Sequence, residues 1–504
     1  MNANRFMLFE QLLANVDRIA RAGGNPVITD VVFDSRQVTP GALFLAMRGE
    51  LSDGNRYIAS ALERGAAAII TDSEVAWREL TASSSHAGLA LVAHGRRTLA
   101  GVSANFFGHP ERTLCLHGVT GTNGKTTTTY ILDAMLRAAG RATVLIGTIE
   151  YRVAGAVFPS PHTTPESRDV FALFAEGVAQ GATEAVMEVS SHALDQGRVW
   201  GMRWDTATFT NLTQDHLDYH GDMERYFQAK ALLFRGQGAA PPRVAIIHAE
   251  DPYGRRLMEI ARDARSEVRT YGLREGDYRA EDVSLDRSAM RFRMHTPHGS
   301  MDVRTRLVGP VNVLNLLGAS AAAMARGLTL EQVQQGIASL DYVPGRFQTI
   351  DCGQPFTVAV DYAHTDDALK NVTALARTIA HERGGRVIAV FGCGGDRDRA
   401  KRPKMGRAAA EGSDFVVITS DNPRSEDPET ILREILPGVE AVGTRYAVLA
   451  DRAEAIRAAV QEARDNDVVV IAGKGHEKVQ IIGGHSLPFD DADEARRAIE
   501  ARML

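Results

Sequence analysis

The feature of this sequence that most constrains its fold is a glycine-rich stretch at residues 117–140. An apolar run at 114–116 precedes it and has the length of a short buried strand. Four threonines follow Lys125, and apolar residues then recur at the spacing of an amphipathic helix. In the predicted order of strand, turn and helix, glycine N–H groups and the helix N-terminus converge on one point, which favours an anion there.

The turn is similar to a phosphate-binding loop, with one departure from the strict pattern. The pattern G-x-x-x-x-G-K-S/T needs a glycine where this chain has Val119, although Gly121 and Gly124 are present. Lys125 could reach the outer phosphates of a nucleotide, and the hydroxyl of Thr126 could bind Mg²⁺. On this stretch alone, a glycine-tolerant turn without a ligand remains an alternative.

Length and composition narrow the class of protein. A chain of 504 residues predicts about three domains, and its net charge of -6 argues against a general nucleic-acid binder. Its 3 cysteines lack metal-ligand spacing, which suits a reducing compartment without disulfides. We see no signal peptide and no apolar run of about 18 residues, so we expect a cytoplasmic protein without membrane insertion.

We predict an α/β fold with three domains, at residues 1–105, 106–343 and 344–504. In the first domain, strands are expected at 27–33, 42–47 and 67–71, and helices at 56–64 and 98–107. In the second, strands at 114–119, 143–149, 185–189, 206–210 and 244–248 alternate with helices, which predicts a mainly parallel sheet. Antiparallel strands at 280–308 and a helix at 313–325 follow. The third domain repeats the doubly wound pattern, with strands near 356–361, 387–392, 415–419 and 467–471.

Polar residues follow several of these strands, where parallel sheets bind ligands. Glu188 and Thr126 together suit Mg²⁺, which prefers oxygen ligands. An imidazole is a less usual Mg²⁺ ligand, so His216 is interpreted as a hydrogen-bonding residue, with a transition-metal site at 215–220 as the alternative. Lys230 lies in an amphipathic helical pattern and is interpreted on that pattern as a solvent-facing residue.

Three polar clusters in the third domain, at 392–399, 419–424 and 473–477, each follow a strand. Because these strands belong to one predicted sheet, the clusters should converge. They offer arginines for a carboxylate and acidic side chains for an ammonium group, so an amino acid is a natural ligand.

Taken in order, these motifs resemble the Mur ligase family, the ATP-dependent amide-bond-forming enzymes of peptidoglycan synthesis. The segments that carry the resemblance are 120–126, 188–192, 211–218, 309–315, 344–347 and 361–365, together with the three clusters. Within the family, the Asp-Asn-Pro-Arg sequence at 421–424 matches members that add meso-2,6-diaminopimelate rather than lysine. Diaminopimelate has an extra carboxylate that Arg424 could pair with, whereas lysine would leave that guanidinium unpaired.

The resemblance implies a UDP-binding N-terminal domain, a central P-loop ATPase-like domain and a C-terminal Rossmann-like domain. It also implies that ATP phosphorylates the D-glutamyl side chain of UDP-N-acetylmuramoyl-L-alanyl-D-glutamate and that the amine of diaminopimelate attacks this acyl phosphate. Family position makes Lys125, Glu188, His216 and Lys230 catalytic, and assigns Mg²⁺ binding to Thr126, Glu188, His216 and Lys230. For that role Lys230 would be carbamylated to N6-carboxylysine, which replaces the solvent-facing interpretation.

The remaining site residues also come from the resemblance. ATP would be bound by Gly121, Thr122, Asn123, Gly124, Lys125, Thr126, Thr127, Asn315, Arg346 and Asp361. The UDP-sugar would be bound by Ser35, Thr163, Thr164, Ser190, Gln196 and Arg198. Diaminopimelate would be bound by Arg397, Asp421, Asn422, Pro423, Arg424, Gly473 and Glu477. His162 departs from the amide residue of some relatives and is given no role.

The expected partners are small-molecule substrates only, and the expected state is a monomer. A lysine-adding relative and a ligase like folylpolyglutamate synthase are the alternative enzymes. The second of these would lack the N-terminal domain and the Asp-Asn-Pro-Arg sequence. A regulatory P-loop NTPase is the alternative from a different class, but it leaves the first domain and the three polar clusters unexplained.

Overall fold

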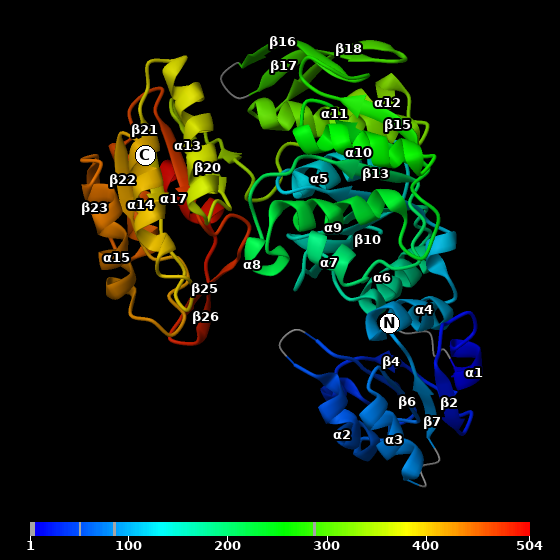
Figure 1. Ribbon diagram of the computed structural model, residues 1–504. Coiled ribbons are helices and arrows are strands. Elements are labelled where there is room, and N and C mark those ends of the chain that lie inside the picture. The colour runs from blue at the N-terminus through cyan, green and yellow to red at the C-terminus, as the bar shows by residue number, and fades with distance from the viewer. Residues whose placement is uncertain (1–5, 50–51, 84–86, 286–288, 504) are drawn as a thin grey trace. The chain divides into compact units, whose positions relative to one another are not determined.

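The structure is a computed structural model that describes residues 6–49, 52–83, 87–285 and 289–503 (Figure 1). The chain divides into two compact units, which are taken one at a time below. The first consists of residues 1–283, 292–303 and 310–339, and the second of residues 284–291, 304–309 and 340–504. The three domain boundaries predicted from the sequence remain predictions.

The first unit begins with a five-stranded sheet in the order β2-β7-β6-β5-β4. Its strands are β2 (Ala20–Gly23), β4 (Val31–Val32), β5 (Leu43–Ala46), β6 (Ala68–Thr71) and β7 (Gly88–Leu91). All neighbours are parallel except β2 and β7. The accompanying helices are α2 (Ile58–Glu63), α3 (Glu74–Ala82) and α4 (Gly95–Phe107).

The prediction of a single strand at 27–33 is wrong. β3 (Val27–Ile28) pairs with β1 (Met7–Leu8), whereas β4 pairs with β5. The chain changes partner at Asp30, whose carbonyl accepts a hydrogen bond from the Leu43 amide at 2.8 Å and whose carboxylate accepts one from the Val31 amide at 2.8 Å. The apolar run is therefore two short strands in two different sheets.

An eight-stranded sheet forms the centre of the first unit, in the order β11-β10-β9-β12-β8-β13-β14-β15. Its strands are β8 (Cys115–Thr120), β9 (Thr143–Ile146), β10 (Glu150–Val153), β11 (Ala156–Pro159), β12 (Glu184–Glu188), β13 (Thr206–Phe209), β14 (Val244–His248) and β15 (Glu267–Tyr271). Six strands are parallel, and only the β10–β11 hairpin runs antiparallel to its neighbours. The prediction of a mainly parallel sheet is confirmed, and the nearly continuous burial of β8, β9 and β12 explains their apolar sequences.

Helix α5 (Lys125–Ala138) follows β8, and α11 (Pro310–Ala325) and α12 (Leu330–Ala338) both pack against it. The expected helix at 313–325 is thus confirmed and begins three residues earlier. The strands expected at 280–308 are β16 (Arg279–Leu285), β17 (Met290–Thr296) and β18 (Gly299–Thr305), which form a separate three-stranded sheet.

The second unit is built on a six-stranded sheet in the order β19-β20-β24-β21-β22-β23, whose strands run from yellow to red in Figure 1. The strands are β19 (Gln348–Ile350), β20 (Thr357–Asp361), β21 (Val387–Phe391), β22 (Phe415–Ile418), β23 (Arg445–Val448) and β24 (Val468–Ala472). One apolar cluster joins this sheet to α13 (Asp366–His381), α14 (Lys401–Gly412) and α15 (Pro428–Glu440). A second joins it to α16 (Arg452–Glu462) and α17 (Asp491–Met503), so helices cover both faces as the doubly wound pattern predicted.

Candidate active site

The phosphate-binding loop lies between β8 and α5, and two of its glycines are required by the packing. Gly121 has φ 152° and Gly124 has φ 86°. A Cβ at Gly121 would lie 1.8 Å from the Thr210 hydroxyl oxygen, and one at Gly124 would lie 2.5 Å from Oδ1 of Asn315. Val119, where the strict pattern has a glycine, is fully buried inside β8. The departure from the pattern therefore falls in the strand and leaves the loop intact.

Two lysines contact the first glycine of this loop. The Lys125 Nζ donates to the carbonyl oxygens of Gly121 and Thr122, both at 2.9 Å. The Lys230 Nζ donates to the Gly121 carbonyl at 2.8 Å from helix α9 (Met223–Arg235). Lys230 is only 1% exposed, so the solvent-facing interpretation of its helical pattern is wrong. Burial, and then the charge of Lys125, lowers the pKa of the Lys230 amine well below its ordinary value.

Glu188 ends β12 next to the loop and is buried. Its Oε2 accepts hydrogen bonds from the hydroxyls of Thr126 and Thr148, both at 3.1 Å, and its Oε1 accepts one from the Thr148 amide at 2.7 Å. A hydroxyl and a carboxylate held side by side beside a phosphate-binding loop are a donor set that fits Mg²⁺. Thr148 is absent from the predicted site, and nothing in its local sequence distinguishes it.

His216 lies in an aromatic cluster on the same unit. Its ring meets the ring of His192 edge-on at a centroid distance of 4.8 Å and that of Tyr226 at 6.1 Å. Burial lowers the pKa of His216, which favours the neutral imidazole that a metal ligand must be. Among the described residues, no three His, Cys, Asp or Glu side chains gather as a metal-binding group.

Five of the six predicted UDP-sugar residues lie around the carboxyl end of β12. The Thr164 hydroxyl donates to the Glu188 carbonyl at 2.9 Å and accepts from the Ser190 amide at 3.1 Å. Arg198 donates to the Thr164 carbonyl at 2.9 Å and to Oε1 of Gln196 at 3.0 Å. The fifth residue, Thr163, shares a hydrogen bond of 3.0 Å with the hydroxyl of Thr148.

Ser35, the sixth, lies in the N-terminal sheet region, in the 3-10 turn Ser35–Gln37. Asp34 caps this turn by accepting a hydrogen bond from the Arg36 amide at 2.9 Å. The nearby Asp30 pairs with Arg168 of helix α6 (Ser167–Ala179) at 3.1 Å. This ion pair joins the segment that leads to Ser35 to helix α6.

The three predicted nucleotide contacts outside the loop lie in both units. Asn315, on α11, accepts a hydrogen bond from the Thr128 hydroxyl at 3.3 Å and so reaches the start of α5. In the second unit, the Asp361 carboxylate accepts the amides of Phe347 at 2.7 Å and Ala363 at 2.9 Å. Arg346 lies beside it, with its guanidinium 5.4 Å from the ring centre of Tyr362.

The polar clusters of the second unit do converge. The Asn422 side-chain amide donates to Oε2 of Glu477 at 2.8 Å, although the two residues lie in separate clusters. A Cβ at Gly473 would lie 2.4 Å from Oδ2 of Asp421. The Arg424 guanidinium donates to the Gly395 carbonyl at 2.6 Å, which joins the cluster at 392–399 to the other two. The Pro423 carbonyl would lie 1.8 Å from a Cβ at Gly395, and Arg397 is exposed in the same loop.

Lys474 is the clearest omission from the predicted site. Its side chain is fully buried, and its Nζ donates to Oδ1 of Asn422 at 2.9 Å and to Oε2 of Glu477 at 3.0 Å. A buried ammonium must be paired, so Lys474 holds these two side chains in one arrangement. The sequence signal that could have identified Lys474 as a site residue is its position inside the 473–477 cluster.

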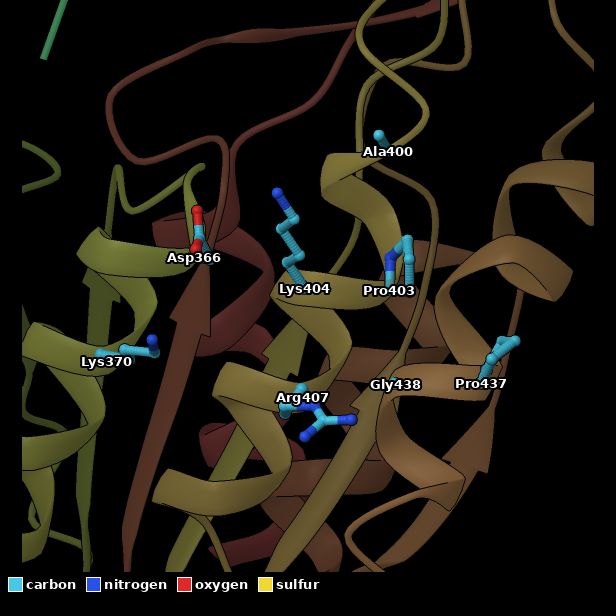
Figure 2. Close-up of a pocket in the computed structure, with 8 residues that line it drawn as sticks. All are labelled: Asp366, Lys370, Ala400, Pro403, Lys404, Arg407, Pro437 and Gly438. Atoms are coloured by element: carbon cyan, nitrogen blue, oxygen red, sulfur yellow. The ribbon is translucent and has the colours of Figure 1, made fainter.

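A groove lies between α13, α14 and α15 (Figure 2). It is lined by Asp366, Lys370, Ala400, Pro403, Lys404, Arg407, Pro437 and Gly438. None of the predicted site residues belongs to it. The candidate site is therefore defined by the strand ends and not by this groove.

No described helix combines the length and apolar character needed to cross a membrane.

Three family profiles match successive parts of the chain. They are described as "Mur ligase family, catalytic domain" at residues 27–100, "Mur ligase middle domain" at 119–323 and "Mur ligase, glutamate ligase domain" at 345–475. The chain belongs to the Mur ligase family. The resemblance predicted from the motifs is thus confirmed.

Individual Mur ligases match this one over nearly its full length. A Solibacter usitatus protein named UDP-N-acetylmuramoyl-L-alanyl-D-glutamate–2,6-diaminopimelate ligase is 50% identical over 474 residues, which cover 94% of each chain. A protein of the same name from Geobacillus thermodenitrificans is 45% identical, over 95% of this chain and 96% of its own. A solved structure bearing that name has 33% identity and a TM-score of 0.70, and the match covers 99% of this chain and 100% of the other. The predicted α/β fold is confirmed.

Proposed function

We propose that this Mur ligase uses ATP to join meso-2,6-diaminopimelate to UDP-N-acetylmuramoyl-L-alanyl-D-glutamate in peptidoglycan precursor synthesis. The observation that carries the proposal is the convergence of Arg424, Asn422 and Glu477 beyond the carboxyl ends of β22 and β24. These groups suit a ligand with carboxylates and an ammonium group. The relatives that match over most of their length are named for the same reaction.

In the first half-reaction, an oxygen of the D-glutamyl side-chain carboxylate attacks the γ-phosphorus of ATP, and the bond to ADP breaks. Lys125 lies where it can turn from the loop carbonyls to the transferring phosphoryl group. Thr126 and Glu188 would hold Mg²⁺, with His216 and carbamylated Lys230 as further ligands. Bound Mg²⁺ supplies positive charge that offsets the charge developing on the phosphoryl oxygens.

In the second half-reaction, the diaminopimelate amine attacks the acyl carbon. The tetrahedral intermediate loses inorganic phosphate, and the nitrogen loses a proton to leave the amide. The residues that bind and orient the amino acid are Arg397, Asp421, Asn422, Pro423, Arg424, Gly473 and Glu477. Arg424 would pair with the carboxylate that lysine lacks, and Glu477 with an ammonium group.

The other substrate would be held in the first unit. Thr163, Thr164, Ser190, Gln196 and Arg198 would bind the UDP-linked dipeptide near the carboxyl end of β12, and Ser35 would bind it from the N-terminal sheet. ATP would be held by the loop residues 121–127 with Asn315, Arg346 and Asp361. Since both nucleotide substrates are cytoplasmic metabolites, we place the reaction in the cytoplasm and propose a monomer that needs no macromolecular partner.

One assay tests the proposal. Purified protein is given ATP, Mg²⁺ and the UDP-linked dipeptide, with either meso-diaminopimelate or lysine, and phosphate release and product mass are measured. We expect turnover that requires both the UDP-linked dipeptide and an amino acid, and that strongly prefers diaminopimelate over lysine. Equal turnover with lysine would favour the lysine-adding alternative, and phosphate release without either acceptor would favour a regulatory NTPase. Activity with a folate in place of the UDP-linked dipeptide would favour the folylpolyglutamate synthase-like alternative.

A further inference from the structure

A two-stranded hairpin follows the last strand of the second sheet, and it was not predicted from the sequence. It consists of β25 (Val479–Ile482) and β26 (His485–Pro488), joined by Gly483 and Gly484. Its outer strand, β26, is fully exposed to solvent. A two-stranded hairpin is marginally stable by itself, so other contacts must hold it in place.

Those contacts go to the Asp-Asn-Pro-Arg loop at residues 421–424. The Arg424 amide donates to the Ile481 carbonyl at 2.9 Å, and the Arg424 carbonyl accepts from the Gly483 amide at 2.7 Å. Arg424 therefore pairs with β25 as a single-residue parallel bridge centred on Ile482. The hairpin thus holds Arg424 by its backbone, while the guanidinium of Arg424 donates to the Gly395 carbonyl on the opposite side of the loop region.

Two more bonds fix the residues before Arg424. The Ile481 amide donates to Oδ1 of Asn422 at 3.0 Å, and the side-chain amide of Gln480 donates to the Asp421 carbonyl at 2.8 Å. Gln480 is buried, so this last bond has no water to replace it. Three of the four loop residues, Asp421, Asn422 and Arg424, are thus hydrogen-bonded to Gln480, Ile481 and Gly483 of the hairpin.

The backbone of Arg424 shows why such support is needed. Its φ is 54°, in the left-handed region that a residue with a side chain rarely adopts. Residues in such conformations persist when the surrounding structure holds them there, and they concentrate at functional sites. The two backbone hydrogen bonds with the hairpin are contacts that hold the Arg424 backbone in this conformation.

We propose that the β25–β26 hairpin positions Arg424 and thereby determines which amino acid the enzyme accepts. This inference rests on the proposed function. Gln480 is a positioning residue in this scheme, because it acts through its hydrogen bond to the Asp421 carbonyl. A displacement of about 1 Å is enough to weaken a bidentate arginine–carboxylate pair. Lysine has no second carboxylate for Arg424, so its turnover is insensitive to such a displacement.

The test compares Gln480→Met with the matched control Ser486→Ala in the same hairpin. Methionine keeps the length and burial of the side chain but has no N–H donor, whereas Ser486 is exposed on the outer strand and keeps its backbone pairing. We expect Gln480→Met to raise the KM for diaminopimelate by about tenfold, as the loss of one buried hydrogen bond predicts. The KM for ATP and the weak turnover of lysine stay unchanged, so the preference for diaminopimelate falls by the same factor.

Two outcomes would overturn the inference: an unchanged KM for diaminopimelate, or equal rises in the KM for both diaminopimelate and ATP. A wild-type enzyme that ignores diaminopimelate would instead overturn the proposed function. Should Gln480→Met fail to fold, hydrogen exchange on the wild-type protein decides the question. Diaminopimelate, but not lysine, should slow exchange of the Arg424 and Gly483 amides together, and protection of one without the other contradicts the hairpin's role.

Discussion

Lys125 and Lys230 donate hydrogen bonds to the same acceptor, the carbonyl oxygen of Gly121, at 2.9 and 2.8 Å. Two ammonium groups so close would repel each other strongly, because burial removes the water that screens their charges. Burial and the charge of Lys125 lower the pKa of Lys230, so its amine favours the neutral form. A neutral amine has the free electron pair that attacks CO₂, and the carbamate so formed would attract Lys125 instead of repelling it.

We therefore predict that Lys230→Ala loses activity by about 100-fold or more, the scale for removing one electrostatic group from a transition state. A bicarbonate-rich buffer should restore part of the activity by supplying a small anion to the vacated space. Initial rates of phosphate release measure both effects. Lys370→Ala, which removes an exposed lysine, is the control and should behave as wild type. Full activity of Lys230→Ala would show that the amine has only a structural role.

Arg424 should act on the amino acid and not on ATP. We predict that Arg424→Ala raises the KM for diaminopimelate by roughly 100-fold, as expected for losing a charge-assisted pair, and leaves the KM for ATP nearly unchanged. Arg424→Lys should recover little, because an ammonium group lacks the planar fork of the guanidinium. Steady-state kinetics with each substrate varied in turn make the comparison. Arg407→Ala, an exposed arginine on α14, is the control.

Lys474 should matter through the two side chains that it holds. Lys474→Met would leave Asn422 and Glu477 without their shared donor, so we predict that the KM for diaminopimelate rises by about tenfold or more. Lys478→Met is a close control, because Lys478 is 65% exposed and forms an ion pair with Asp490 at the base of the hairpin. Similar kinetics for the two variants would mean that Asn422 and Glu477 hold their arrangement without the buried cation.

The sequence was sufficient to predict the parts of the site whose residues are contiguous in the chain. The strand, glycine-rich turn and helix from β8 to α5 are contiguous, so apolar spacing and glycine positions predicted them. The helical pattern was insufficient to predict the burial of Lys230. An amphipathic pattern does not reveal that this polar residue of α9 contacts a buried carbonyl 109 residues away in the sequence. The hairpin was missed for the same reason, since Gln480 acquires its role from a carbonyl 59 positions earlier. Such roles depend on tertiary contacts, which periodicity does not encode.

Neutralising the two glutamates at the ends of β12 should change different properties of the protein, namely its Mg²⁺ dependence and its stability. Glu188, at the carboxyl end, contacts Thr126 and is the proposed Mg²⁺ ligand. We predict that Glu188→Gln raises the Mg²⁺ concentration needed for half-maximal activity by at least about tenfold, because a neutral amide binds a hard cation more weakly than a carboxylate does. Titration of the apo enzyme with Mg²⁺ after EDTA treatment measures this. A normal Mg²⁺ dependence with a low maximal rate would place Glu188 outside the metal site.

Glu184, at the amino end of β12, should instead affect stability. Its fully buried carboxylate contacts His117 at 3.0 Å, Arg141 at 2.6 Å and Arg326 at 3.1 Å. Burial by itself would raise the pKa of Glu184, but the hydrogen bond from His117 and the neighbouring arginines outweigh it and lower the pKa below 4.5. Removing one partner of such a buried network costs about 3–5 kcal/mol, so Glu184→Gln should melt several degrees lower at pH 7 with unchanged KM values.

The pH dependence of that loss follows from the direction of the pKa shift. A carboxylate whose pKa is lower in the folded state stabilises the fold fully above the ordinary value of 4.5, and this stabilisation is lost as the pH falls through the folded-state pKa. The gap in melting temperature between wild type and Glu184→Gln should therefore be widest near neutral pH and should narrow as the pH drops below 4.5. Glu74→Gln, which breaks an exposed ion pair with Arg78, should show little gap at any pH. A gap for Glu184→Gln that stays constant down to acidic pH would mean that lost packing, and not the charge of the carboxylate, accounts for the destabilisation.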